Sequence, residues 1–321
     1  METENKNTPD LSELVLDNSG RSTYRGCKQK YFLQIINGWQ SNYGSTALRF
    51  GSCWHAIQEH YYTWIKENGW PDSPESLMTA INLGLVAGNA EYIKETGVKE
   101  FYDDFKNFNT AVEMFDQYID YFTGDKDCVK IIATEQKFKC QIEPENSLEE
   151  KLLSKLPPII FTGKIDQCIK LDGIKWLLDF KTTGWRLDKV IAQANRSPQL
   201  IGYSYAGKKV LGFEPEGCMC SFAHLNSTKS RVTGLYGKNR FEFKRIPQVY
   251  TEGDIAAWKL SFIDTAREIK YSLDEDLWPE SFDNCFQYGA CPYLRLCQQH
   301  RPYEELNFDG FHVDHWSVLD E

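Results

Sequence analysis

The sequence predicts an α/β fold with a mixed central sheet flanked by helices. Three observations lead to this prediction. Most of the first 128 residues carry helical periodicity, and residues 129–182 alternate like strands around an Asp172-Gly173 turn. Helical and strand-like segments then alternate as far as residue 273, which is typical of an α/β layer architecture.

The first half of the chain is expected to be helical. Residues 24–37 and 46–67 read as two helices, and 74–124 as a helical insertion broken at Gly84, Gly88 and Gly97. The 1–20 stretch is polar and reads as a leader with one short possible helix.

The strands and later helices have clear boundary signals. Asp172-Gly173 is a two-residue hairpin turn, and Ser197 with Pro198 suits the start of a helix. The expected strands are 129–142, 158–170, 174–182, 217–225 and 240–247; the expected helices are 198–210 and 252–273; a cysteine-rich loop covers 282–300.

Composition limits the class of protein. The 321 residues fit one large domain or two modest ones, and 41% hydrophobic content supports a sizeable core. No stretch reaches the roughly 18–20 apolar residues of a membrane span, and the N-terminus lacks the blocks of a signal peptide. We therefore expect a cytoplasmic protein, in a bacterium or a phage-infected cell. The net charge of −10 predicts weak non-specific DNA binding outside a local basic lining.

Two acids and one lysine are expected to meet on the hairpin. Asp179 and Lys181 lie two residues apart on one strand and so share a face. The Asp172-Gly173 turn places Asp166, on the preceding strand, approximately opposite Asp179. A surface hairpin with an ordinary salt bridge would have the same sequence pattern.

This set of side chains suits phosphodiester hydrolysis. Mn²⁺ and Mg²⁺ prefer oxygen ligands, which Asp166, Asp179 and the Phe180 backbone carbonyl would supply. Lys181 would orient a water and stabilise charge at phosphorus. Glu135, on the first strand, is a further candidate acid.

Three more side chains are candidates for the same site. His55 lies on a predicted helix with Glu59 one turn later, and Gln199 shares a helix face with Tyr203. Taken singly, a partly buried histidine and a packing tyrosine are the ordinary readings of these patterns.

Together, His55, Gly163-x-x-Asp166, Asp179-Phe180-Lys181 and Gln199-x-x-x-Tyr203 resemble the RecB-type branch of the PD-(D/E)XK nucleases. The resemblance runs from about residue 24 to 300 and implies a restriction-endonuclease-like fold and a DNA exonuclease. It implies that His55, Asp166 and Asp179 bind Mn²⁺ or Mg²⁺, that Lys181 is catalytic, and that Gln199 and Tyr203 line the site and contact DNA. The chain departs from the family at Ile165, where the family name implies proline, and has Asp179 where many members have glutamate.

Four of the ten cysteines form a second constellation. Cys285-x5-Cys291-x5-Cys297 has a fourth candidate in Cys27, and four thiolates are what an iron–sulfur cluster or structural zinc requires. Buried, inert cysteines are the alternative, and that is the expectation for the other six, at 53, 128, 140, 168, 218 and 220.

These cysteines resemble those of the iron–sulfur nucleases of the RecB branch, which include the AddB nuclease domain and the CRISPR-adaptation nucleases. The resemblance implies a [4Fe–4S] cluster that ties the chain ends together. The usual C-terminal spacing in that group is Cys-x2-Cys-x5-Cys, so the longer first spacer here puts Cys285 in question.

We expect five segments: a leader at 1–23, a helical region at 24–128, a nuclease core at 129–250, a helix and cluster loop at 251–300, and an acidic tail at 301–321 that could dock on a protein partner. Candidate DNA contacts are Trp185, Arg186, Lys189 and Arg196, followed by Lys208, Lys209, Lys229, Arg231, Lys238, Arg240, Lys244 and Arg245. A catalytically idle DNA-binding subunit, or a redox-sensing iron–sulfur subunit that keeps the fold, is the alternative function.

Overall fold

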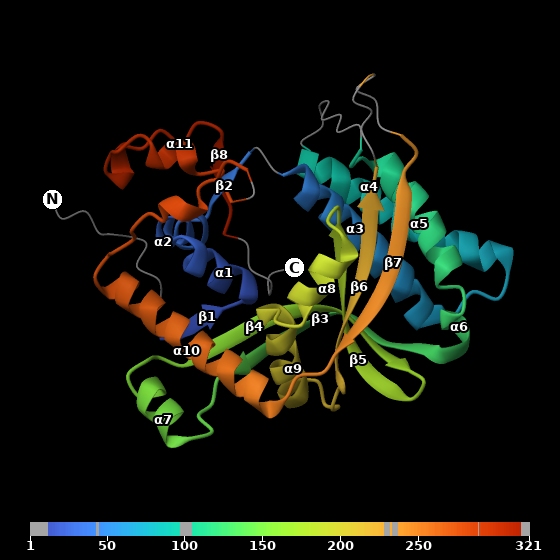
Figure 1. Cartoon of the computed structure of the whole chain (residues 1–321), viewed down its shortest axis with the longest axis horizontal. Helices are drawn as coiled ribbons and strands as arrows, with labels where there is room; N and C mark the ends of the chain where they lie inside the picture. The colour runs from blue at the N-terminus through green and yellow to red at the C-terminus, as the bar shows by residue number, and fades with distance from the viewer. Residues whose placement is uncertain are drawn as a thin grey trace. The chain divides into compact units, whose positions relative to one another are not determined.

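The computed structural model describes residues 12–42, 45–96, 105–227, 232, 237–287 and 289–315 (Figure 1). The chain forms two compact units. The terminal unit comprises Met1–Tyr43, Lys137–Gly163 and Glu252–Glu321, and the central unit comprises Gly44–Gln136 and Lys164–Thr251. Within the described ranges, no helix combines the length and the apolar character that crossing a membrane requires.

A mixed sheet forms the middle of the central unit. Strand β4 (Ile159–Leu171) pairs antiparallel with β5 (Ile174–Thr183), β5 pairs parallel with β6 (Gly217–Asn226), and β6 pairs antiparallel with β7 (Arg240–Gln248). Strand β3 (Val129–Gln141) also pairs with β4. The predicted α/β fold with a mixed sheet is therefore confirmed.

Helices cover both faces of this sheet, as the ribbons around β5 to β7 in Figure 1 show. On one face lie α3 (Thr46–Asn68), α4 (Pro74–Thr96), α5 (Phe108–Tyr121) and the short α6 (Asp125–Cys128). Their apolar side chains share a core with alternate residues of β5, among them Leu178 and Phe180. On the other face, α8 (Leu187–Ala194) packs on β6 and α9 (Pro198–Val210) packs on β5 and β6.

Two glycines that were expected to break the helical insertion lie inside the continuous helix α4. A Cβ on Gly88 would come within 2.3 Å of Ile57 Cγ1, and one on Gly84 within 2.8 Å of the Ile57 carbonyl oxygen. These glycines therefore allow α4 to pack closely on α3 instead of ending the helix. Gly97, the third expected break, lies outside the described residues.

The terminal unit contains more regular structure than the sequence predicted. The expected leader, 1–23 with one short possible helix, includes β1 (Leu14–Leu16), which pairs parallel with the start of β4, and most of α1 (Asn18–Gly26). The single helix expected at 24–37 is divided at Cys27, whose extended backbone (φ −162°) separates α1 from α2 (Lys28–Tyr31). The remaining elements are a π-helical turn (Phe32–Ile36), β2 (Trp39–Ser41) antiparallel to β8 (Phe311–Val313), α7 (Ser147–Leu153), α10 (Glu252–Asp274), α11 (Leu294–Cys297) and two 3₁₀ turns (Phe282–Asn284 and Tyr303–Glu305).

A buried ion pair joins α7 to α10 in this unit. Lys259 has no exposed surface, and its Nζ lies 2.7 Å from Glu149 Oε2 and 3.4 Å from Glu145 Oε2. Burial by itself would raise the pKa of Glu149, but hydrogen bonds from Lys259 and nearby backbone and the Lys259 charge bring the pKa below its ordinary value. Removing one partner would leave a buried charge uncompensated.

We predict that Lys259→Ala lowers the free energy of unfolding by about 3 kcal/mol, because Glu149 is left buried and unpaired. The double variant Lys259→Met/Glu149→Leu should lose much less, since both charges are gone. Because folding lowers the pKa of Glu149, the contribution of the pair is present above pH 4.5 and disappears as the pH falls through the folded-state value. Urea unfolding measures each change, and Arg267→Ala, on the exposed face of α10, is the control. Equal losses for Lys259→Ala and Arg267→Ala would contradict the prediction.

Candidate active site

Strand β5 presents Asp179 and Lys181 on the face that α9 covers. Leu178 and Phe180 point into the core on the opposite face, so the two charged residues share a side. Asp179 is 1% exposed, and both of its carboxylate oxygens lie 2.9 Å from Lys181 Nζ. Burial lowers the pKa of Lys181, but the Asp179 and Asp166 carboxylates outweigh it, so the pKa lies above its ordinary value.

The β4–β5 register brings Asp166 to the same site. Gln167 faces Leu178, which places Asp166 beside the Asp179–Phe180 peptide, and the Phe180 amide donates to Asp166 Oδ2 at 2.7 Å. Burial and then the Asp179 charge raise the pKa of Asp166. The expected approach of the two carboxylates is therefore present in the structure.

Helix α3 supplies His55 to this carboxylate. His55 Nδ1 lies 3.3 Å from Asp166 Oδ2, the same oxygen that accepts from Phe180. Burial, followed by the Lys181 charge, lowers the pKa of His55. The imidazole is therefore neutral near pH 7, which is the form that binds metals.

Helix α9 holds the lysine from the other side. The Ser197 side chain caps α9 by accepting from Leu200 N. Gln199 Oε1 accepts from Lys181 Nζ at 3.1 Å, and Gln199 Nε2 donates to the Tyr203 hydroxyl at 3.0 Å. That hydroxyl donates to the Lys164 backbone carbonyl at 2.8 Å, so a chain of hydrogen bonds runs from Lys181 to β4.

This series of hydrogen bonds changes the interpretation of Tyr203. The family resemblance implied that Tyr203 contacts DNA, but the residue is 5% exposed and its hydroxyl has two partners within the protein. Its contacts are those of a residue that supports Gln199.

A second ion pair lies beside the acids. Lys164 Nζ is 2.6 Å from Glu135 Oε2, which joins β4 to β3. Burial and the nearby Asp166 charge raise the pKa of Glu135 to about 7. Sequence reasoning singled out Glu135 but missed Lys164, although its position two residues before Asp166 places it on the same strand face.

The donor types fit a hard divalent cation, since carboxylate oxygens and imidazole suit Mn²⁺ and Mg²⁺. Among the residues that the structure describes, no three His, Cys, Asp or Glu side chains are grouped closely enough to enclose a single ion. The Asp179 oxygens are held by Lys181 in this arrangement. His55, Asp166 and Asp179 are nevertheless the side chains that could hold a cation here.

The candidate DNA contacts differ in exposure. Trp185 is 54% exposed, Lys189 and Arg196 are exposed, and the exposed Arg186 pairs with Asp188. Arg245, in contrast, has a side chain that is only 11% exposed, and its guanidinium is held by other residues of the protein. It pairs with Asp125 at 2.7 Å, donates to the Tyr62 and Tyr118 hydroxyls and lies over the Phe122 ring. Lys229 and Arg231 lie outside the described residues.

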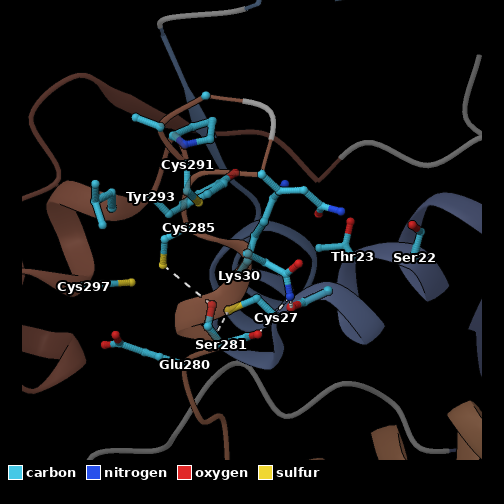
Figure 2. A pocket seen from close by; sticks show the side chains of 17 residues that line it. Ser22, Thr23, Cys27, Lys30, Glu280, Ser281, Cys285, Cys291, Tyr293 and Cys297 are labelled. Atoms are coloured by element: carbon cyan, nitrogen blue, oxygen red, sulfur yellow. Dashed lines mark hydrogen bonds between the residues drawn. The ribbon is translucent and has the colours of Figure 1, made fainter.

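In the terminal unit, the four expected cysteines line one pocket of about 280 Å³ (Figure 2). Cys27 comes from the break between α1 and α2, Cys285 and Cys291 from the loop after α10, and Cys297 from the end of α11. Ser281 N donates to Cys27 Sγ at 3.4 Å, and Cys291 N donates to the Cys285 carbonyl at 2.8 Å. All four are free thiols.

The thiols of this pocket interact electrostatically. Burial raises the pKa of Cys297 to about 12, with further contributions from Glu280 and the other three thiols. Burial, together with the charges of Cys291 and Cys27, also raises the pKa of Cys285. Four negative thiolates around one pocket would therefore need a cationic group to offset their repulsion. Four thiolates are the ligands that a [4Fe–4S] cluster takes, and these four cysteines are the residues of the pocket that could supply them.

A family model described as the PD-(D/E)XK nuclease superfamily matches residues 19–298. A solved structure from Eubacterium rectale, described as a "Putative exonuclease", is 14% identical with a TM-score of 0.45, and the match covers 94% of each chain. No curated protein matches.

We predict that Tyr203→Phe lowers the free energy of unfolding by about 1–2 kcal/mol, because the Lys164 carbonyl and the Gln199 amide each lose a buried partner. Chemical denaturation measures the change. Tyr121→Phe is the matched control, since Tyr121 is 61% exposed. A loss no greater than that of the control would show that the hydrogen-bond chain contributes nothing to stability.

Proposed function

The chain belongs to the PD-(D/E)XK nuclease superfamily, and on that premise we propose that it is a Mn²⁺- or Mg²⁺-dependent DNA exonuclease. One observation supports the catalytic part of this proposal above the others. Asp166, Asp179 and Lys181 converge on one side of the sheet, with His55 against Asp166. Buried carboxylates without such a role would be costly to keep in so small a space.

In this proposal the acids and the histidine bind the cation. His55, Asp166 and Asp179 supply side-chain ligands, and the Phe180 carbonyl supplies a backbone oxygen. When bound, the cation would neutralise charge on phosphate oxygen and help to activate water. The Phe180 amide keeps Asp166 oriented through its 2.7 Å hydrogen bond.

Lys181 is the catalytic amine of the proposal. Its raised pKa keeps it protonated at neutral pH, so it can orient the attacking water and stabilise the charged phosphorus centre. Gln199 and, behind it, Tyr203 hold the ammonium in place. This gives the pair a positioning role in addition to any contact with DNA.

The substrate in this proposal is DNA, at its ends or in single strands, during recombination, repair or phage DNA metabolism. The exposed Trp185 and the cations Arg186, Lys189 and Arg196 follow β5 in the chain and suit stacking on a base and contact with phosphates. Because the whole chain carries a charge of −10, the electrostatic attraction for DNA would have to come from these local cations.

We also propose that Cys27, Cys285, Cys291 and Cys297 hold a [4Fe–4S] cluster, as in the RecB-like iron–sulfur branch. Their convergence on one pocket, from both ends of the chain, supports this proposal. Closing a loop of that length would restrict the unfolded chain by an amount comparable to a disulfide, about 4–5 kcal/mol. The role of the cluster would therefore be to stabilise the fold.

We expect Asp179→Ala, Lys181→Met and His55→Ala each to reduce Mn²⁺-dependent cleavage by about 100-fold or more, because each removes a cation ligand or the charge that stabilises the transition state. Timed digestion of end-labelled single- and double-stranded DNA, with Mn²⁺, Mg²⁺ or EDTA, measures this.

Asp120→Ala and Lys130→Ala are matched controls on the exposed surface of the same unit. Wild-type rates in the Asp179 or Lys181 variants would refute the proposed site. Binding of DNA without cleavage in any metal would favour the catalytically idle alternative.

For the cysteines, anaerobically purified protein should contain iron and inorganic sulfide and be brown, whereas zinc would leave it colourless. Cys27→Ser or Cys297→Ser should remove most of the iron and the visible absorbance. Cys128→Ser, outside this pocket, should change neither. Zinc at one equivalent with no iron would refute the cluster. Cluster oxidation that changed DNA affinity in a protein without nuclease activity would favour the redox-sensing alternative.

A further inference from the structure

Glu135 adopts a backbone conformation that side chains rarely take. Its φ is +48°, in the left-handed region that disfavours residues with a Cβ. The other described non-glycine residues with positive φ, Asp172, Asp276 and His300, lie in turns or after helices, whereas Glu135 lies inside strand β3. Such strain persists only where the surroundings impose it.

The surroundings of Glu135 show what this conformation achieves. The preceding residue, Thr134, shares a 2.8 Å hydrogen bond with Thr63 of α3. The Glu135 carboxylate, largely buried, then meets Lys164 Nζ at 2.6 Å. The strained residue therefore directs a carboxylate at one particular ammonium group.

Lys164 lies close to Asp166 on the same strand. It lies two residues before Asp166 on β4, so both side chains project from the same face, about 7 Å apart along the strand. The Lys164 ammonium lies close enough to act electrostatically on both Asp166 and His55. A flexible lysine side chain at this separation could reach the Asp166 carboxylate directly.

Contact between that ammonium and Asp166 would harm a cation site. A positive charge on the carboxylate repels a divalent cation and occupies the oxygen that should bind it. Lys181 already neutralises Asp179 in this way. If Lys164 also contacted Asp166, both Asp166 and Asp179 would be paired with lysines.

We propose that Glu135 is a positioning residue that restrains Lys164 and so keeps the Asp166 carboxylate available to the catalytic cation. Tyr203 holds the backbone carbonyl of Lys164 while Glu135 holds its ammonium, so the residue is fixed at both ends. This inference rests on the proposed function, because it takes Asp166 as a cation ligand. Its specific content is that Glu135 acts on the cation through Lys164 and not by contact.

Direct Mn²⁺ binding tests the proposal without relying on cleavage. The free Mn²⁺ signal in electron paramagnetic resonance would be titrated with wild type, Glu135→Gln, Lys164→Met and the double variant Glu135→Gln/Lys164→Met. Asp166→Ala tests the underlying site. Urea unfolding of each variant separates loss of binding from loss of the fold.

We expect Glu135→Gln to weaken Mn²⁺ binding by about tenfold, the lower end of the effect of losing a residue behind a metal ligand. The double variant should return to wild-type affinity, because the competing ammonium is absent. A merely structural ion pair would lower stability in Glu135→Gln and Lys164→Met alike and leave the affinity for Mn²⁺ unchanged.

Three outcomes are decisive against the proposal: unchanged binding in Glu135→Gln, no recovery in the double variant, or weaker binding in Lys164→Met alone. If Glu135→Gln does not fold, Lys164→Met carries the test, and binding as tight as wild type or tighter supports the proposal. If wild type itself shows no Mn²⁺ binding that depends on Asp166, the proposed metal site fails, and this result is distinct from failure of the Glu135 role.

Discussion

The register of the β4–β5 hairpin is the constraint on which the candidate site depends. The Asp172-Gly173 turn fixes which residues face each other, and Gly173 adopts the positive φ (+88°) that such a turn needs. With Gln167 opposite Leu178, the Phe180 amide reaches the Asp166 carboxylate. A slip of one residue would turn every side chain of one strand to the other face, which would bury Lys181 in the core and separate the acids.

Charge balance follows from that geometry. Near one end of the hairpin lie three acids and two lysines, and each lysine is held by a carboxylate: Lys181 by Asp179 and Lys164 by Glu135. Asp166, in contrast, accepts a hydrogen bond from a backbone amide and contacts neutral His55. The site is therefore arranged so that cations of the protein do not occupy every carboxylate, as a cation-dependent hydrolase would require.

Local signals made the hairpin and α9 predictable, because the Asp172-Gly173 turn and the Ser197-Pro198 start act within a few residues. Features that depend on tertiary packing were not predictable in this way. Arg245 looks like a surface cation in the sequence, but its side chain is mostly enclosed because Asp125, two tyrosine hydroxyls and an aromatic face surround it. The left-handed backbone of Glu135 and the extended backbone of Cys27 cannot be read from hydrophobic periodicity, and each residue contacts a partner far away in the chain.

The break at Cys27 has a physical consequence for the cysteine pocket. A continuous helix over 24–37 would have pointed successive side chains 100° apart around one axis. The extended residue instead leaves the Cys27 sulfur to accept from Ser281 N. Asn284 Nδ2 donates to the neighbouring Gly26 carbonyl at 2.7 Å, which satisfies one of the carbonyls freed at the end of α1. The same loop that carries Cys285 therefore stabilises the conformation that presents Cys27, so these two thiols are held together by protein contacts before any metal is considered.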